Sequence, residues 1–217
     1  MTGSGAAPAW IALVRHGITE WNERGLIQGH TDIPLSAAGM AGLRRVRVGA
    51  GFLAARWVTS PLRRAVQTAA ILNPGVKADI HPALVEAKWG DFEGLRRDQL
   101  ARQISDLGLK PERGLDFAPP AGESPRQVQR RLRRWFEATA AANPGRAVVA
   151  VTHKGVIRSA LSIACHWDMT ADFGAKTHWS LPHIFRFSGG GELQLARLNC
   201  PWDQPPDTPG DNAAPPA

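Results

Sequence analysis

The stretch LVRHGITEWN, residues 13–22, decides how the rest of the chain is interpreted. It continues a short apolar run, residues 10–14, which predicts a buried strand, and the polar residues after Gly17 predict a loop. In α/β proteins, reactive groups gather where strands end and loops begin. His16 occupies such a position, between a cation and a glycine that permits a tight turn. Taken alone, these residues fit a reactive histidine and an ordinary surface histidine equally well.

The composition is that of a globular domain with an excess of arginine. The chain has 217 residues, 43% hydrophobic and 21% charged, with a formal net charge of +7 and a pI of about 10.4. The arginines cluster at residues 44–45, 63–64, 96–97 and 130–134. Such clusters can bind an anionic ligand, such as a phosphate ester or a nucleic acid, or can form solvated helix faces. Away from the strand ends we favour solvated faces, and we expect no nucleic-acid partner.

Two cysteines, Cys165 and Cys200, match neither a disulfide framework nor a zinc site in their spacing. This predicts a reducing, cytoplasmic environment. Residues 1–8 lack the basic region of a secretory signal, and no apolar run is long enough to cross a bilayer. We therefore expect no membrane partner.

Apolar runs that alternate with helical periodicity predict a three-layer α/β/α sandwich with a mostly parallel central sheet. The predicted strands are residues 10–14, 56–59, 78–84 and 147–151, followed by a hairpin of residues 184–187 and 193–198. The predicted helices are residues 37–49, 62–72, 97–107, 123–142 and 156–165. Together these elements predict a single domain over residues 1–200. Residues 201–217 are rich in Pro, Asp and Ala, and we expect them to be disordered.

Several predicted strand ends carry groups suited to phosphoryl chemistry. His16 follows the first strand beside Arg15, Arg63 follows the second, and His153 follows the run at residues 147–151. Because the ends of parallel strands lie along one edge of a sheet, these side chains should converge there. Glu86, from a fourth loop, would join them.

This combination of side chains predicts phosphoryl transfer. Two guanidiniums can bind a phosphoryl group bidentately, and a neutral histidine can attack phosphorus. A second histidine can donate to the phosphoryl oxygens, and a carboxyl group can protonate the leaving oxygen. The cations take the place of a metal, and the histidine spacing matches no metal motif, so we expect neither a metal site nor a cofactor. The other histidines are predicted to be structural or exposed: His30, His81, His166, His178 and His183.

Six motifs in order resemble those of the histidine phosphatase superfamily, also called the phosphoglycerate mutase-like family. They are LVRHG with Thr19 and Asn22, GHTDIPLS at 29–36, SPLRRAVQTA at 60–69, LVE at 84–86 with GDFEG at 90–94, GES at 122–124, and THKGVIR at 152–158. One RHG motif is weak evidence, whereas six in the right order are specific. The resemblance covers residues 11–164 and implies a phosphoglycerate mutase-like fold.

Carried over position by position, the resemblance implies that His16 is the phosphorylated nucleophile and Glu86 the proton donor. The implied phosphate pocket comprises Arg15, Arg63 and His153, helped by Asn22, with Thr19, Gln28 and Gly29 lining the site. Lys154 departs from the family, because many relatives have a small residue there. It either adds a cation near the substrate or points to solvent.

The resemblance leaves the reaction open, since phosphatases and cofactor-dependent phosphoglycerate mutases share the phosphohistidine. The mutases carry a longer insertion after the acid loop, whereas here only residues 87–121 separate Glu86 from Gly122. We therefore expect a metal-independent phosphomonoesterase, similar to the small bacterial phosphatases that include α-ribazole phosphatase. The alternatives are a mutase and a catalytically idle protein that binds phosphorylated ligands.

The expected partner is a small phosphorylated metabolite, but the sequence does not say which ester, or whether the chain forms a homo-oligomer. Three tryptophans could either stack on a substrate or pack within the protein, and we favour packing for them: Trp89, Trp167 and Trp179.

Overall fold

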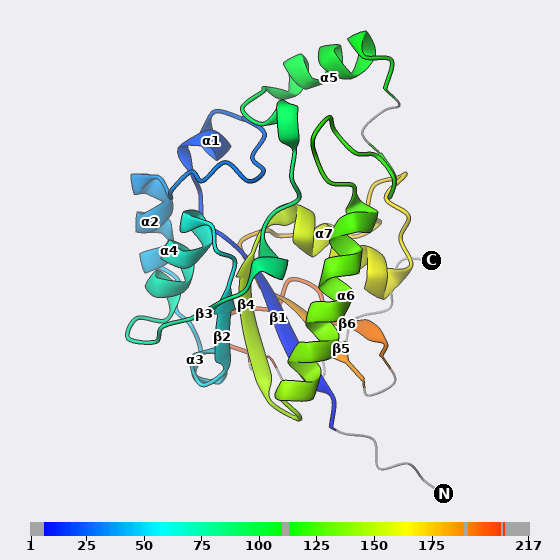
Figure 1. Ribbon diagram of the computed structural model, residues 1–217. Helices are drawn as coiled ribbons and strands as arrows, with labels where there is room; N and C mark the ends of the chain where they lie inside the picture. The colour runs from blue at the N-terminus through cyan, green and yellow to red at the C-terminus, as the bar shows by residue number, and fades with distance from the viewer. Residues whose placement is uncertain (1–6, 110–112, 189–190, 205, 207–217) are drawn as a thin grey trace, which may run out of the picture.

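A six-stranded sheet forms the centre of the computed structural model (Figure 1), which describes residues 7–109, 113–188, 191–204 and 206. The strand order is β3-β2-β4-β1-β5-β6. The strands are β1 (Ala9–Arg15), β2 (Arg56–Thr59), β3 (Asp79–Ile80), β4 (Ala147–Thr152), β5 (His183–Phe187) and β6 (Leu193–Arg197). The first four are mutually parallel, and β5 runs antiparallel to β1. The predicted, mostly parallel sheet is therefore confirmed.

The register of the sheet aligns the strand ends that carry the motifs. Arg15 at the end of β1 lies opposite Thr152 at the end of β4, so the residues that follow, His16 and His153, leave the sheet side by side. On the other side of β4, Thr59 of β2 pairs with Val151. Three segments distant in sequence thus emerge at one edge, because parallel strands all end in the same direction.

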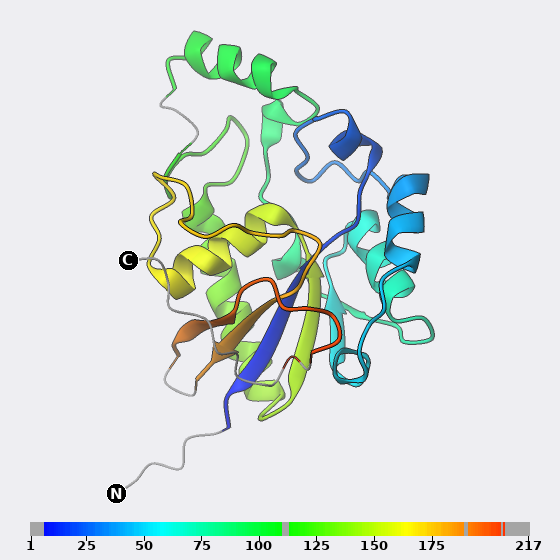
Figure 2. The same ribbon diagram turned by 180° about the vertical axis from the view of Figure 1, so that it is seen from behind.

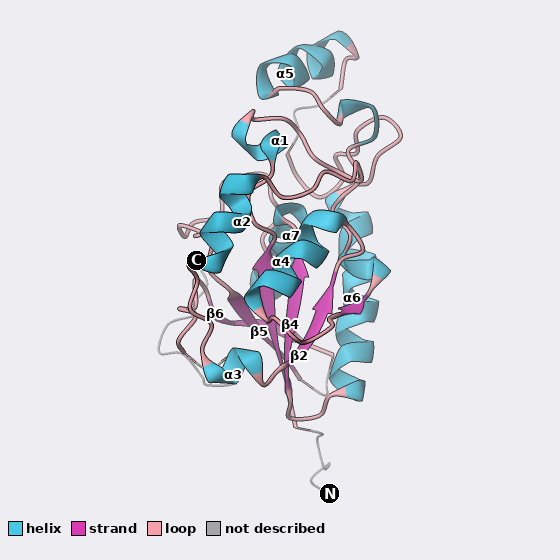
Figure 3. Ribbon diagram, turned by 90° about the vertical axis from the view of Figure 1, so that its left-hand side faces the viewer, coloured by secondary structure: helices cyan, strands magenta, loops and turns pink. Residues whose placement is uncertain are grey.

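Helices cover both faces of the sheet, as the side view shows (Figure 3). One face carries α6 (Pro125–Ala142) and α7 (Lys154–Cys165), and the other carries α2 (Ala37–Arg44), α3 (Ala50–Leu53) and α4 (Arg63–Leu72). Ile11 and Leu13 of β1 belong to the hydrophobic core shared with α6 and α7. Ala12 and Val14 belong to the core shared with α3 and α4. This alternation is the period of two of a strand buried on both faces, and it makes the predicted three-layer sandwich.

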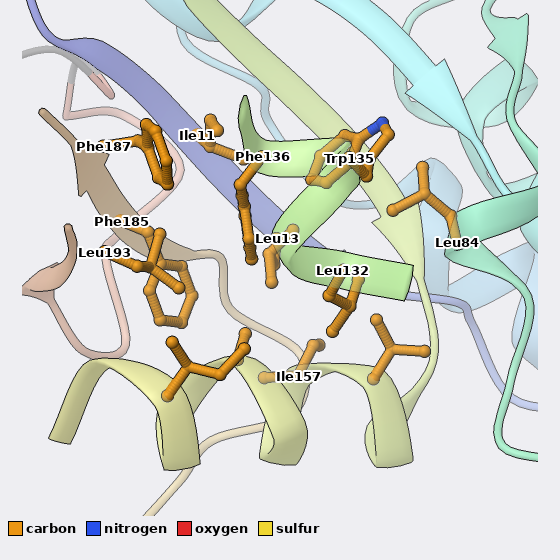
Figure 4. Close-up of a cluster of buried hydrophobic side chains, with 14 of the residues drawn as sticks. Ile11, Leu13, Leu84, Leu132, Trp135, Phe136, Ile157, Phe185, Phe187 and Leu193 are labelled. Carbon is orange, nitrogen blue, oxygen red and sulfur yellow. The ribbon is translucent and has the colours of Figure 1, made fainter. Parts of the chain in front are cut away.

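The core beneath α6 and α7 is dense in aromatic side chains (Figure 4). Phe136 of α6 stacks on Phe187 of β5, with ring centroids 6.3 Å apart, and contacts Trp135 at 5.1 Å. The apolar stripe of α6 is therefore packing, as its helical spacing predicts. Seen from behind (Figure 2), the connection from α7 to β5 passes over the upper end of the sheet.

A small cap lies above the strand ends, and it consists of the described residues 87–109 and 113–121. It holds α5 (Arg97–Asp106), which stands apart from the sheet in Figure 1, and a 3-10 turn, Gly90–Phe92. Phe92 and Leu100 form a separate core there with Ile104. The short α1 (Glu20–Glu23) lies beside the cap in the same view.

Three expectations need correction. The helix predicted for residues 37–49 ends at Arg44, and α3 starts a new helix after Gly49, whose N–H donates to the carbonyl of Trp202. The strand predicted for residues 78–84 stops at Ile80, because Pro82 cannot donate to a ladder and opens a 3-10 turn, Pro82–Leu84.

The third correction concerns the segment after residue 200, which was expected to bury little. Trp202 is buried against Phe52, with ring centroids 5.1 Å apart. The expected disorder otherwise falls on residues 205 and 207–217, which lie outside the described residues.

Candidate active site

A pocket of about 590 Å³ opens at the strand ends, beneath the cap. The segments that line it include the end of β1, α1 with the loop after it, the cap, the start of α7, and the connection that follows α7. Its polar lining includes Arg15, His16, Asn22, Gln28, Glu86, Lys154 and Arg158. Six of the ten predicted site residues therefore line one cavity. Thr19, Gly29, Arg63 and His153 are placed below.

His16 is held in one orientation with a free nitrogen. Its side chain is 6% exposed, its backbone N–H donates to the Thr152 carbonyl, and its ring Nδ1 lies 2.7 Å from the Gly17 carbonyl oxygen. A carbonyl only accepts, so Nδ1 must carry the proton, and Nε2 of the neutral ring keeps its lone pair. Burial lowers the pKa of His16 well below 6.5, reinforced by the positive charges of Arg15 and Arg64. At neutral pH the His16 ring is therefore uncharged.

His153 lies directly against His16, with ring centroids 5.1 Å apart at an angle of 55°. Its Nδ1 accepts a hydrogen bond from Arg64 Nε at 3.3 Å, and its Nε2 lies 2.7 Å from Ser60 Oγ. The guanidinium has no lone pair to offer, so Nδ1 of His153 is unprotonated and Nε2 carries the hydrogen. Burial and the charge of Arg64 lower the pKa of His153 well below its usual value. The two adjacent rings are therefore neutral and of opposite tautomers.

The structure places Arg64 in the site, not Arg63, which corrects the sequence-based assignment. Arg63 is exposed at the start of α4, and its backbone N–H donates to Asp32. Arg64 is fully buried and donates from its two terminal nitrogens to the carbonyls of Gly29 and Thr31, at 2.8 and 2.9 Å. The reason is helical geometry: successive side chains point about 100° apart, so only one of two neighbours can face the histidines.

Two buried polar atoms of the pocket lack a partner among the described residues. They are Nε of Arg15 and Oε1 of Gln28. Buried polar groups are nearly always hydrogen-bonded, so this donor and this acceptor are available to a polar ligand in the pocket. Burial lowers the pKa of the Arg15 guanidinium, and Glu86 opposes this effect.

Glu86 is 7% exposed and lies at the N-terminus of α7. Its two carboxylate oxygens accept from the backbone N–H groups of Ala87 and Gly155, at 2.9 and 3.1 Å. A Cβ at position 155 would lie 2.5 Å from Glu86 Oε1, so the glycine there permits this close approach. The acid of the predicted set thus lines the same pocket as His16.

The loop that carries Glu86 is supported by Arg131, which sequence reasoning assigned to a solvated cluster. Arg131 pairs with the carboxylate of Glu123 through two hydrogen bonds, both 3.1 Å. Its other contacts are to the carbonyls of Ala83, at 2.6 Å, and Glu86, at 3.1 Å. His30 Nε2 also lies 2.8 Å from the Glu86 carbonyl. The signal that could have revealed Arg131 is its helical spacing, three residues after the buried Val128 and four before the buried Trp135.

Thr19 and Gly29 do not line the pocket but support residues that form the site. Thr19 is buried and caps α1, and its hydroxyl donates to Asn22 Oδ1 at 3.0 Å, which orients a pocket-lining side chain. Gly29 packs so closely that a Cβ would lie 2.1 Å from Glu93 Oε1. Although burial opposes it, hydrogen bonds from Thr31, His30 and the backbone of Trp89 lower the pKa of Glu93. This carboxylate therefore ties the loop at Gly29 to the cap.

Lys154 lines the pocket, and its Nζ lies 5.1 Å from the ring centroid of Trp179. Of the three tryptophans, Trp89 also lines the pocket, while Trp167 packs against Phe173 and beneath Arg158. Among the described residues, no group of three or more His, Cys, Asp or Glu side chains is arranged to hold a metal ion. In the described part of the chain, no helix is both long and apolar enough to span a membrane.

The chain belongs to the histidine phosphatase superfamily (branch 1), whose family model matches residues 11–199. Among curated relatives, Bifunctional protein Rv2228c of Mycobacterium tuberculosis is 32% identical over 75% of this chain and 46% of its own length. The chain thus spans less than half of that relative. A 2,3-bisphosphoglycerate-dependent phosphoglycerate mutase of Methylobacterium radiotolerans is 32% identical over 70% of this chain and 77% of its own.

Solved structures confirm the phosphoglycerate mutase-like fold. Mycobacterial hydrolase 1 superposes with a TM-score of 0.74 at 25% identity, covering 89% of this chain and 99% of the other. A proposed α-ribazole-5′-phosphate phosphatase from Escherichia coli has a TM-score of 0.68 at 22% identity, covering 90% and 97%. The family contains both phosphatases and mutases, so membership in it does not identify the reaction of this chain.

Proposed function

We propose that this protein is a phosphomonoesterase that hydrolyses small phosphate esters through a phosphohistidine on His16. The observation that carries the proposal is the pairing of two neutral histidines of opposite tautomers beside Arg15 and Arg64, with Glu86 lining the same pocket. The free lone pair on His16 Nε2 is the nucleophile. The cations supply the positive charge that a phosphoryl group requires.

In the first step, Nε2 of His16 forms a bond to phosphorus while the bond from phosphorus to the ester oxygen breaks. Glu86, in its acid form, gives its proton to the departing oxygen, so an alcohol leaves. Arg15 donates to the phosphoryl oxygens as charge builds, and the positive charge of Arg64 beside the two histidines adds to this stabilisation. The hydrogen bond from Nδ1 to the Gly17 carbonyl stabilises the positive charge that the His16 ring acquires.

In the second step, a water molecule attacks the phosphorus and the bond from Nε2 to phosphorus breaks. The Glu86 carboxylate takes the proton of that water, and inorganic phosphate leaves. His16 and the acid form of Glu86 are then restored. Every proton is accounted for without a metal, so we expect activity to persist in a chelator.

The mutase reaction differs only in the second step, where a hydroxyl of the bound substrate would replace water. The relative from Methylobacterium radiotolerans is a mutase at 32% identity, so identity alone does not choose between the reactions. The short cap favours hydrolysis, because a mutase must keep water away from the phosphohistidine. The cap is limited to residues 87–121, and the pocket beneath it is roomy at about 590 Å³.

The test is phosphate release from a panel of phosphomonoesters in EDTA, with isomerisation of 3-phosphoglycerate followed in parallel. We expect phosphate release that is abolished in His16→Ala and unchanged in His178→Ala, an exposed histidine that serves as the matched control. Label from a radioactive ester should remain on the wild-type chain after an alkaline quench and be lost in acid.

Three outcomes would contradict the proposal. Isomerisation without net phosphate release would identify a mutase. A His16→Ala variant within about tenfold of wild type would remove the nucleophile. Binding of phosphorylated ligands without turnover of any ester would identify a binding protein.

A further inference from the structure

Lys154 carries a positive charge at a position where a positive charge destabilises a helix. It is the first residue of α7, where the partial positive charge of the helix dipole repels an ammonium. Its neighbours add to this repulsion. Burial lowers the pKa of Lys154, and the charges of Arg15, Arg158 and Arg97 lower it further, although Glu86 opposes this effect. A lysine held against both effects points to a role in the pocket that it lines.

The ammonium of Lys154 is also held in place. Its Nζ lies 5.1 Å from the centroid of the Trp179 ring, a cation–π contact. Trp179 is itself half-buried and packs against the core beneath α6 and α7. The Trp179 ring therefore restricts the position of the ammonium at the pocket wall. A solvated lysine would instead sample many rotamers.

The pocket wall is rich in positive charge. Its lining includes five cations, namely Arg15, Arg97, Arg113, Lys154 and Arg158. The carboxylates in the lining are Glu86, Glu123 and Asp172. Each of these three carboxylates already has a partner. Glu86 accepts from two backbone N–H groups, Glu123 pairs with Arg131, and Asp172 lies 3.9 Å from Arg113. Among the described residues, Lys154 has no carboxylate within ion-pair distance.

The positive charges form two groups that share Arg15. Arg15 and Arg64 are the charges that lower the pKa of His16, so both lie near its ring. Lys154 is affected by Arg15, Arg158 and Arg97, of which Arg97 comes from the cap. The second group therefore extends from Arg15 toward the cap, whose Arg97 also lines the pocket.

We propose that Lys154 binds a second anionic group of the substrate, so that the preferred esters carry a carboxylate or a second phosphate besides the phosphoryl group that is transferred. This inference rests on the proposed phosphatase function. The ammonium would donate to the second anion from the wall supported by Trp179, while Arg15 lies between the two anions.

The test uses two pairs of esters that differ only in the second anion. The first pair is 3-phosphoglycerate and glycerol 3-phosphate, and the second is fructose 1,6-bisphosphate and fructose 6-phosphate. Each is measured as a substrate and as a competitive inhibitor of p-nitrophenyl phosphate hydrolysis, in wild type, Lys154→Met and Lys154→Arg. Lys77→Met is the control, because it removes the same charge from an exposed loop outside the pocket.

We expect wild type to prefer the doubly anionic member of at least one pair. Lys154→Met should lose about 10- to 100-fold of that preference, the effect of losing one hydrogen bond to a charged group. Its activity on the singly anionic esters should fall by a smaller factor, and Lys154→Arg should keep part of the preference. The pair that responds identifies the second anion as a carboxylate or a phosphate.

The inference fails if wild type shows no preference in either pair, or if Lys154→Met lowers both members equally. Either result would leave the phosphatase function standing, because p-nitrophenyl phosphate would still be hydrolysed. If no ester is hydrolysed, the proposed function fails instead. Calorimetric binding of the same pairs would then decide whether Lys154 discriminates: a preference lost in Lys154→Met supports the inference, and equal binding overturns it.

Discussion

The side chain of Arg64 donates from Nε to Nδ1 of His153 at 3.3 Å, and this contact determines which nitrogen of His153 carries its hydrogen. The same guanidinium donates to the carbonyls of Gly29 and Thr31. One fully buried arginine therefore orients a histidine of the site and holds the loop beside the pocket. Its neighbour in sequence, Arg63, is exposed and makes none of these three contacts.

The first prediction separates these two arginines. Arg64→Ala should lower kcat/KM by at least about 100-fold, because it removes a charge beside both histidines and frees His153 to adopt the other tautomer. Arg63→Ala should stay within about threefold of wild type. Steady-state kinetics on p-nitrophenyl phosphate measures both, and circular dichroism checks that Arg64→Ala is folded. A large loss in Arg63→Ala with a small one in Arg64→Ala would restore the sequence-based assignment.

The second prediction concerns Glu86 as the proton donor. Glu86→Gln keeps the size of the side chain and an oxygen that can accept from Gly155, but it cannot release a proton. Esters with poor leaving groups should lose about 100- to 10,000-fold in kcat/KM, the usual contribution of general acid catalysis. p-Nitrophenyl phosphate should lose much less, since nitrophenolate leaves without protonation. Equal losses on alkyl and nitrophenyl esters would remove Glu86 from this role.

The third prediction concerns Arg131, which supports the Glu86 loop from α6. Arg131→Met should lower the free energy of unfolding by roughly 1–3 kcal/mol, because partly buried carbonyls and the Glu123 carboxylate lose their partner. Activity should also fall as the loop shifts, most strongly on esters with poor leaving groups. Urea denaturation and leaving-group kinetics measure the two effects. Arg133→Met, on an exposed position of the same helix, should change neither.

The fourth prediction is a loss of stability in acid. Burial lowers the pKa of His183 from 6.5 to about 4, and its Nδ1 accepts from the Asn199 N–H. Between these pH values the unfolded chain binds a proton that the folded chain excludes, so the free energy of unfolding falls as the pH falls. The shift corresponds to about 3 kcal/mol for this residue.

The variant His183→Asn isolates this effect, since it keeps an acceptor near the Asn199 N–H and has no proton to gain. Its unfolding free energy, measured by urea denaturation from pH 7 to pH 4, should fall less steeply than that of wild type. Parallel curves would show that other groups cause the acid sensitivity.

The low pKa of His16 has a kinetic consequence. Because the His16 ring stays neutral at pH 6.5, protonation of this ring should not lower kcat/KM between pH 7 and pH 6.5.

Much of the fold could be predicted because its signals are local. Unbroken apolar runs such as residues 147–151 indicated buried parallel strands, and the stripe of α6 indicated a helix packed on a core. The order of the motifs placed His16 and His153 at strand ends, and the pairing of Arg15 with Thr152 brings them together. The sequence pattern alone is sufficient to place these two histidines, because neighbouring parallel strands end at the same edge of the sheet.

What the sequence by itself determined is therefore the class of fold, the strand ends at which the candidate site lies and the kinds of side chain gathered there. Only the tertiary structure decided which of two adjacent arginines faces the histidines, because that depends on where α4 begins and on its rotation. It also decided that Arg131 supports the Glu86 loop and that Trp202 packs on Phe52. These contacts join segments far apart in the chain, and their partners are set by packing rather than by any local periodicity.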